Sequence, residues 1–283
     1  MGKIFDAIEK SSTEKSVSSI SSIKRKADFK DKTIREEKLL TAPLSLEDFY
    51  QYDKSLISLL KPQSFEAEQF KILRTNILFP SSGKPPRVIM VSSAVPGEGK
   101  SFVASNLAIS IAQNIDEHVL LMDCDLRIPS IHKRFGFEEV KGLSDYLSGS
   151  ESFSSLLLKT KLEKLSILPG GRLSSNPSEL LISDKMTKLI NEVKDRYSDR
   201  YVIIDSAPPQ LTAELAAISR LVDGVILVIN YGKTKREIIA GLVEMLGKEK
   251  ILGIVLNRFD LRSSTYYGYG KYSKYEKYYG NKS

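Results

Sequence analysis

A phosphate-binding loop is the clearest chemical feature of this sequence. Residues 94–101 read AVPGEGKS and match the pattern GxxxxGK[ST], except that Ala94 stands at the first glycine. The two glycines would let backbone amides approach a polyphosphate, the lysine could reach its outer phosphates, and the serine hydroxyl could bind Mg²⁺. A predicted helix follows, and its N-terminal dipole favours an anion. We therefore expect nucleotide binding by Val95, Pro96, Gly97, Glu98, Gly99, Lys100, Ser101 and Phe102.

Three carboxylates follow predicted strands and could bind a metal ion or accept a proton. In HVLLMDCDLRIP, Asp123 and Asp125 are two residues apart, so at the end of an extended strand they point to the same side. In YVIIDSAPP, Asp205 ends a buried apolar strand, as a Walker B aspartate does. A single such Asp often caps a helix, but three beside a phosphate loop favour a metal site. We expect metal binding by Ser101, Asp123 and Asp205, and catalysis by Lys100, Asp123 and Asp125.

The C-terminal tail concentrates a third reactive group, the tyrosine hydroxyl. Seven of the thirteen tyrosines lie in the last eighteen residues, in a stretch with Gly, Ser and Lys spacers and no aliphatic residue, which predicts disorder. One interpretation is a sticky low-complexity tail; the other is that these phenols are a substrate. The candidate sites of phosphorylation are Tyr266, Tyr267, Tyr269, Tyr272, Tyr275, Tyr278 and Tyr279.

Six short apolar runs would position the loop and the aspartates. They span residues 87–93, 118–123, 164–169, 200–205, 224–230 and 251–257, and helix-length segments separate most of them. This alternation predicts an α/β fold with a doubly wound, mainly parallel sheet and helices on both faces. Ligands of such sheets bind at the carboxyl ends of the strands, where the loop and the aspartates fall. Cys124 should point into the core, without a redox role.

Length and composition indicate one folded domain with two appendages. The 283 residues, 41% of them hydrophobic, can bury one core of about two hundred residues. We expect a flexible N-terminal arm over residues 1–60, the folded domain over 61–261 and the disordered tail over 262–283. Apolar runs fall far short of the roughly 20 residues that span a bilayer, and no signal peptide is present, so we expect a cytoplasmic protein.

Charge and cysteine content exclude some further classes of protein and of binding site. One cysteine excludes an internal disulfide framework or a metal cage built from cysteines alone. The net charge of +7 is concentrated near both ends of the chain. Such basic segments can attract anionic lipid or nucleic acid, but they are more often solvated linkers, and we expect no nucleic-acid partner.

Together these motifs resemble those of the bacterial tyrosine kinases (BY-kinases), which control capsule and exopolysaccharide synthesis. AVPGEGKS, VLLMDCDLRIP and YVIIDSAPP are followed by GIVLNRFD and the tyrosine cluster, and RIPSIHKRFG, GLSDYLSG and LPGGRLSSNPSELL also fit, so that the resemblance covers about residues 64–283. It implies a P-loop NTPase fold that uses ATP and Mg²⁺ to phosphorylate tyrosines of its own tail in a neighbouring subunit. It also places Asn257 at the nucleotide, and it leaves open whether Asp123 or Asp125 accepts the phenol proton.

The resemblance further implies partners. These kinases are activated by a membrane-anchored polysaccharide co-polymerase with a cytoplasmic segment, which we expect to be a separate polypeptide that recruits the kinase to the inner face of the membrane. A tyrosine phosphatase would oppose the kinase. The family assembles in rings through an ExxRxxR helix, matched here by Glu68, Lys71 and Arg74, with Lys71 lacking the forked geometry of arginine. The same three residues could also form an ordinary charged helix face.

Two alternatives to a kinase are a partitioning or septum-positioning ATPase of the MinD/ParA-like group and a nucleotide-dependent binding switch. The first carries a signature lysine in the loop, where this chain has Val95, and its cycle does not explain the tyrosines. The second would use the basic ends of the chain to bind a membrane protein or DNA.

Overall fold

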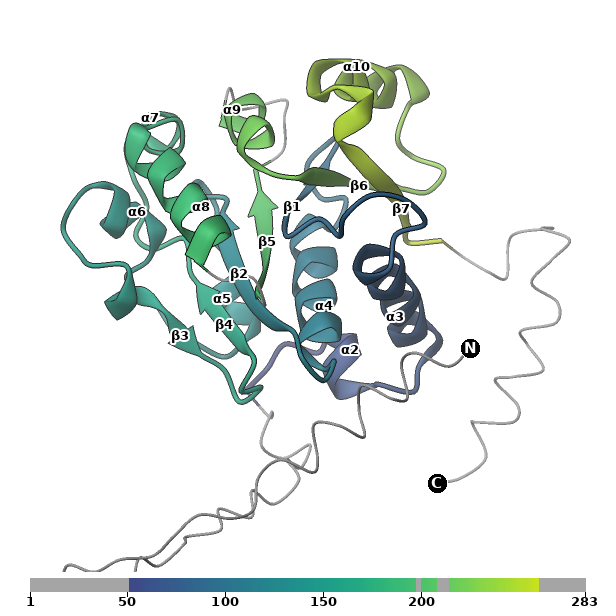
Figure 1. The fold of residues 1–283 in the computed structure, drawn as a ribbon, viewed down its shortest axis with the longest axis horizontal. Coiled ribbons are helices and arrows are strands. Elements are labelled where there is room, and N and C mark those ends of the chain that lie inside the picture. The colour runs from purple at the N-terminus through teal and green to yellow at the C-terminus, as the bar shows by residue number, and fades with distance from the viewer. Residues whose placement is uncertain (1–50, 197–199, 208–213, 260–283) are drawn as a thin grey trace, which may run out of the picture. The chain divides into compact units, whose positions relative to one another are not determined.

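The computed structural model describes residues 51–196, 200–207 and 214–259 (Figure 1). The tyrosine cluster, the start of the tail and residues 1–50 of the N-terminal arm lie outside these described residues. Among the helices that the structure describes, none has the length and apolar character to cross a membrane.

A seven-stranded sheet forms the centre of the domain, with strand order β3-β4-β2-β5-β1-β6-β7. All neighbouring strands run parallel except β3, which is antiparallel to β4. The predicted doubly wound sheet is therefore confirmed, and the short strand β3 is an addition to it. The strands are β1 Val88–Ser93, β2 His118–Cys124, β3 Leu158–Lys159, β4 Leu165–Leu168, β5 Arg200–Ser206, β6 Gly224–Asn230 and β7 Ile251–Asn257.

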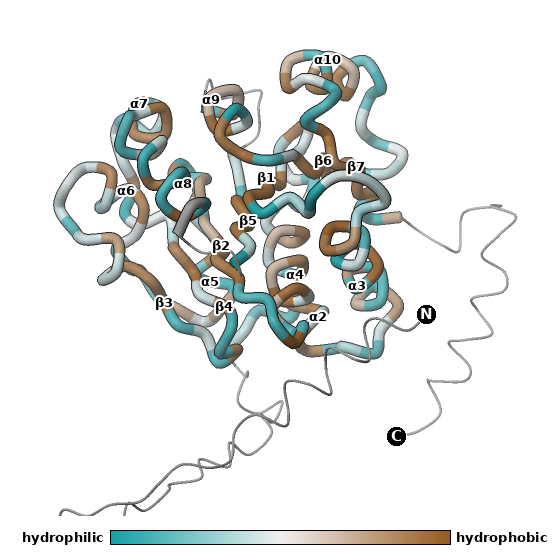
Figure 2. The backbone as a smooth tube through the Cα atoms, in the orientation of Figure 1, coloured by the Kyte–Doolittle hydropathy of each residue, from teal (hydrophilic) through white to brown (hydrophobic). Residues whose placement is uncertain are grey.

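Helices cover both faces of the sheet. Alternate residues of the central strands enter opposite cores: Ile89 and Val91 of β1 pack on one side, and Val88 and Met90 on the other. The first core is closed by α2 Ile57–Leu60, α3 Phe65–Leu78, α4 Lys100–Ala112 and α5 Ile131–Arg134. The second is closed by α6 Leu143–Leu147, α7 Pro177–Leu181, α8 Asp184–Arg196, α9 Glu214–Leu221 and α10 Arg236–Leu246. Figure 2 shows the most hydrophobic segments gathered in the strands.

The folded domain extends further toward the N-terminus than the sequence pattern suggested. Leu56 is fully buried, and α2 packs against α4, although residues 51–60 were expected to belong to the arm. Asn106 of α4 anchors this segment: its Oδ1 accepts from Ser58 N at 2.8 Å, and its Nδ2 donates to Ser55 O at 2.9 Å. The segment has only ten residues and a four-residue helix, so it is too short for an apolar period to be recognised from sequence.

Candidate active site

The phosphate loop joins β1 to α4 at the carboxyl end of the sheet. Gly97 and Gly99 have φ angles of +79° and +97°, a region that favours glycine. At Gly99 a side chain is excluded by space as well, because an added Cβ would lie 2.2 Å from Asn257 Nδ2. At Gly97 an added Cβ would meet no atom within 4 Å, so the loop is open there. Lys100 and Ser101 begin α4, with their backbone amides at the positive end of its dipole.

The carboxylates of Asp123 and Asp205 lie side by side at this edge. The two residues are paired in register on β2 and β5, and both are fully buried. Asp123 is held by backbone amides, since its Oδ2 accepts from Ser130 N at 2.9 Å and Ile131 N at 3.0 Å. Neither carboxylate oxygen of Asp205 has a hydrogen-bond partner in the part of the chain that the structure describes. Asp205 therefore presents two unused buried acceptor atoms beside the phosphate loop.

Burial and mutual repulsion oppose ionisation of this pair. Burial, and then the charge of Asp205, raises the pKa of Asp123 to about 8, although the amides of Ile131 and Ser130 lower it. Burial likewise raises the pKa of Asp205 to about 6, while the nearby Ser101 hydroxyl and Lys100 oppose the rise without giving either oxygen a hydrogen bond of standard geometry. A cation between the carboxylates would remove the cost of their charge.

The residues present fit a divalent metal ion. Mg²⁺ prefers oxygen ligands and is usually held by one or two carboxylates together with substrate phosphates. Asp205, Asp123 and the Ser101 hydroxyl supply such oxygens beside the loop. The described residues contain no group of three or more His, Cys, Asp or Glu side chains that could hold an ion, so a nucleotide would have to complete the ligand set.

Asp125 has a different setting from its two neighbours. It is only partly buried, and its Oδ1 accepts from Ile128 N at 3.1 Å, which fixes the turn after β2. Between the two aspartates, Cys124 is fully buried in the second core, where burial raises the pKa of its thiol well above the usual value. The expectation that Cys124 points into the core is confirmed.

Similarity to known proteins agrees with this geometry. The family model described as ParA, NUBPL iron-transfer P-loop NTPase, matches residues 84–265. Tyrosine-protein kinase YwqD of Bacillus subtilis is 37% identical over 76% of this chain and 91% of its own length. Tyrosine-protein kinase CpsD of Streptococcus agalactiae is 35% identical over 73% of this chain and 90% of its own. The chain belongs to the bacterial tyrosine kinase family.

Solved structures place this kinase in the same fold. The kinase domain of Escherichia coli tyrosine kinase ETK matches with a TM-score of 0.68 and 32% identity, covering 76% of this chain and 84% of that one. The septum site-determining protein MinD of Pyrococcus horikoshii, solved as a complex with Mg-ADP, matches less well, with a TM-score of 0.51 and 25% identity over 63% of this chain and 72% of its own. The kinase interpretation is thus favoured over the MinD/ParA-like alternative, and the P-loop NTPase fold is confirmed.

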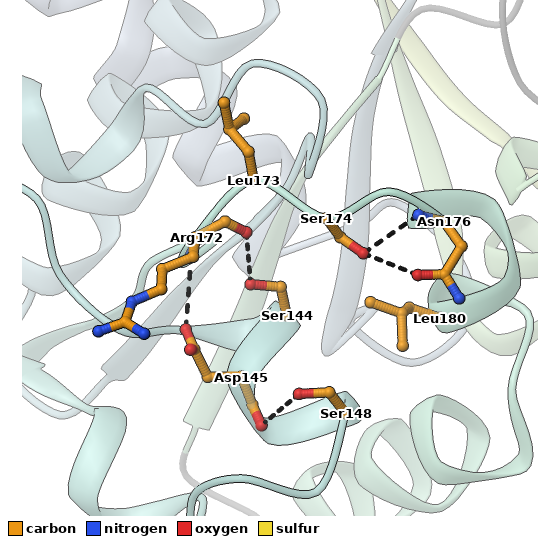
Figure 3. Close-up of a pocket in the computed structure, with 8 residues that line it drawn as sticks. All are labelled: Ser144, Asp145, Ser148, Arg172, Leu173, Ser174, Asn176 and Leu180. Carbon is orange, nitrogen blue, oxygen red and sulfur yellow. Dashed lines mark hydrogen bonds between the residues drawn. The ribbon is translucent and has the colours of Figure 1, made fainter.

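Two further stretches of the kinase meet around a pocket (Figure 3). GLSDYLSG forms α6, and LPGGRLSSNPSELL runs from the end of β4 into α7. They are joined where Ser144 Oγ donates to Arg172 O at 2.7 Å and where Asp145 Oδ2 accepts from Arg172 N at 3.5 Å. A pocket of about 330 Å³ lies between them, lined by Ser144, Asp145, Ser148, Arg172, Leu173, Ser174, Asn176 and Leu180.

The predicted assembly residues all lie on α3, but their side chains make different contacts. Lys71 Nζ lies 3.0 Å from Glu68 Oε2 in an ion pair on the helix surface. Arg74 instead turns inward, and its Nη1 donates to Ser110 O of α4 at 2.8 Å. The structure therefore gives Arg74 a role within its own subunit, while Glu68 and Lys71 stay accessible.

Sequence reasoning missed several side chains that shape the site. Arg127, which follows the two aspartates, lies 3.4 Å from the buried carboxylate of Glu214 and donates to Ser178 Oγ at 3.0 Å. This contact ties the loop after β2 to α9 and α7. Glu98 was expected among the nucleotide-binding residues, but its side chain is buried and turned away from the open loop, so only its backbone is available to a phosphate. The contacts of Arg127 have no local sequence signal, because Ser178 and Glu214 are 51 and 87 positions away.

Proposed function

We propose that this kinase transfers the γ-phosphate of ATP to tyrosines of its own C-terminal tail in a neighbouring subunit, in a system for capsule or exopolysaccharide synthesis. The single observation that carries the proposal is the open phosphate loop directly beside the Asp205 carboxylate, whose two buried oxygens accept no hydrogen bond from the residues that the structure describes. Membership of a family whose relatives are named tyrosine-protein kinases supports tyrosine as the acceptor.

The chemistry follows from these residues. Backbone amides of residues 97–102 and the Lys100 ammonium bind the phosphates and hold the γ-phosphoryl group in place. Ser101, Asp205 and Asp123 would hold Mg²⁺, which would further neutralise the phosphate charge. The phenol oxygen attacks the γ-phosphorus, the bond to the β-phosphate oxygen breaks, and ADP leaves with the bonding electrons.

The phenol proton needs an acceptor, because the pKa of tyrosine is about 10. We assign it to Asp125, since Asp123 is fully buried with both oxygens already accepting from backbone amides, whereas Asp125 is partly exposed. Asp123 then serves with Asp205 at the metal. Asn257 contributes at the edge of the nucleotide site, where its Nδ2 donates to Glu98 O at 2.7 Å.

The tail is a suitable substrate because it is tethered. Twenty flexible residues have a root-mean-square span of roughly 25 Å, which reaches a neighbouring subunit and gives an effective concentration on the order of millimolar. Little sequence recognition is then needed, which fits seven tyrosines separated by small and basic residues. All seven lie outside the described residues.

The partners belong to the same proposal. A membrane-anchored polysaccharide co-polymerase would activate the kinase through a cytoplasmic segment and recruit it to the inner face of the membrane. A ring of kinase subunits would bring each tail to the next active site, and a tyrosine phosphatase would reset the tail.

The test is intact mass spectrometry of the full chain after incubation with ATP and Mg²⁺, beside Lys100→Ala. We expect successive additions of about 80 Da, one per phosphate, in the wild type alone, and peptide mapping should place them in the tail. Thermal unfolding of the variant checks that it is folded. If the wild type gains no mass even with the cytoplasmic segment of the co-polymerase supplied, the chain is a nucleotide-dependent switch and not a kinase.

A further inference from the structure

We infer that Glu98 is a positioning residue, which braces the phosphate loop against the ends of β6 and β7 so that the loop keeps its open shape before ATP arrives. Glu98 is a charged residue in the middle of the loop, yet it is only 1% exposed. Its burial is not needed for the hydrophobic core, and its carboxylate does not face the open side of the loop. A buried carboxylate persists only where several donors stabilise it.

Three donors surround this carboxylate. Glu98 Oε2 accepts from Val95 N at 2.9 Å, which closes the loop on itself. Glu98 Oε1 accepts from Asn230 N at 3.0 Å and from the Thr234 hydroxyl, so the loop is joined to the last residue of β6 and to the turn before α10. The carboxylate thus connects two parts of the chain that are more than 130 positions apart.

The backbone of the same residue makes the connection to β7. Glu98 O accepts from Asn257 Nδ2 at 2.7 Å, and Asn257 is the last residue of that strand. Asn257 is in turn fixed by Tyr231, whose N donates to Asn257 O at 3.0 Å. The loop therefore rests on the carboxyl ends of two strands of the rigid sheet.

Such a brace is needed because of the loop's own flexibility. Two glycines in the left-handed region lose more conformational freedom on ordering than any other residue type, and residues 96 and 97 are exposed. A loop that collapsed or fluctuated without ligand would have to be ordered at the expense of binding affinity. With the brace in place, this ordering is complete before ATP binds.

The brace requires a carboxylate and not merely a polar side chain. Each of its oxygens faces a donor, one on the Val95 side and one on the side of Asn230 and Thr234. Glutamine has one acceptor oxygen and one amide donor, so one side would be left with two donors facing each other. A buried donor without an acceptor is destabilising, so the loop would shift away from one of its two anchors.

The test compares Glu98→Gln with the wild-type full chain by titration calorimetry with ATP and Mg²⁺, and by kinetics. We expect the Kd and the KM for ATP to rise about tenfold, which corresponds to about 1.4 kcal/mol. The KM for the protein acceptor, supplied as a Lys100→Ala chain, should change less than about twofold. Glu244→Gln on the exposed face of α10 is the matched control for loss of one carboxylate.

A second pair of variants keeps the test decisive if Glu98→Gln folds poorly. Thr234→Val removes one donor to the carboxylate and should weaken ATP binding about threefold, whereas Thr234→Ser keeps the hydroxyl and should restore it. Wild-type affinity in both Glu98→Gln and Thr234→Val, or an equal rise in the KM for ATP and for the acceptor, would overturn the inference.

The inference rests on the proposed use of ATP, but the two can fail separately. A wild-type chain that does not bind ATP contradicts both. A wild-type chain that binds ATP without phosphorylating its tail contradicts the kinase proposal, while the comparison of affinities still decides the role of Glu98.

Discussion

At the scale of single residues, the pair Asp123 and Asp205 should make the stability of the kinase depend on pH when nucleotide and Mg²⁺ are absent. Burial raises the pKa of Asp123 to about 8 and that of Asp205 to about 6. Between about pH 4 and pH 8 the folded chain therefore holds protons that the unfolded chain has released, so the free energy of unfolding falls as pH rises. We expect the Tm of the wild type, measured in EDTA, to fall across this window. The Tm of Asp205→Asn should fall less steeply, because the asparagine side chain cannot ionise.

The matched control is Asp116→Asn, which removes an exposed carboxylate just before β2, at the opposite end of that strand from Asp123, and should leave the slope of Tm against pH unchanged. Saturating Mg²⁺ and ADP should abolish the fall, since the bound cation stabilises the ionised pair. A Tm in EDTA that rises from pH 5 to pH 8 would contradict the raised pKa values.

The chemical groups of the site were predictable from sequence, but the contacts that hold them in position were not. The phosphate loop, Asp123 and Asp205 follow directly from motifs placed after strands, because parallel strands bring their carboxyl ends to one edge. The inward turn of Glu98 and the contact between Arg127 and Glu214 depend on which strands are neighbours, and a local pattern does not carry that information.

At the scale of elements, α3 separates a stability role from an assembly role. The Arg74 guanidinium donates to Ser110 O in the last turn of α4, where carbonyl groups lack helical partners. We expect Arg74→Ala to lower the free energy of unfolding by about 1–3 kcal/mol, because a charged hydrogen bond is lost. Lys71→Ala should cost less than about 0.5 kcal/mol, since its ion pair with Glu68 is on the surface. Urea unfolding measures both.

If α3 forms the contact between subunits, Lys71→Ala should reduce assembly in sedimentation velocity at unchanged stability. Lys71→Arg should strengthen assembly, because a guanidinium restores the forked geometry that the family pattern carries. Assembly that is insensitive to both changes would mean that α3 is only a charged helix face.

The elements themselves were predictable where their apolar pattern was long. All six predicted runs are strands. Four of them, β1, β2, β5 and β6, each place four or more residues in the two cores. The shortest elements were not predictable. Strand β3 has two residues and helix α2 has four, which are too few for an apolar period to appear. Strand β7 also departs from the expected burial on both faces, because Leu252, Ile254 and Leu256 are about half exposed at the edge of the sheet.

At the scale of the whole molecule, phosphorylation of the tail should act on assembly through charge. Residues 262–283 carry five basic side chains and one acidic side chain, a net charge of +4, and the active site contains buried carboxylates. Each phosphate adds about −1.5 to −2, so four phosphates bring the tail to about −2 to −4. A positive tail is attracted to an acidic site on the next subunit, and a negative tail is repelled by it.

We therefore expect the phosphorylated kinase to sediment as a smaller species than a variant with all seven tail tyrosines changed to Phe, which keeps the charge of +4 and cannot be modified. The difference should shrink as salt is raised, because solvent-exposed charges are screened beyond about 10 Å at 0.1 M ionic strength. The same sedimentation coefficient for both proteins at low salt would show that tail charge does not control assembly.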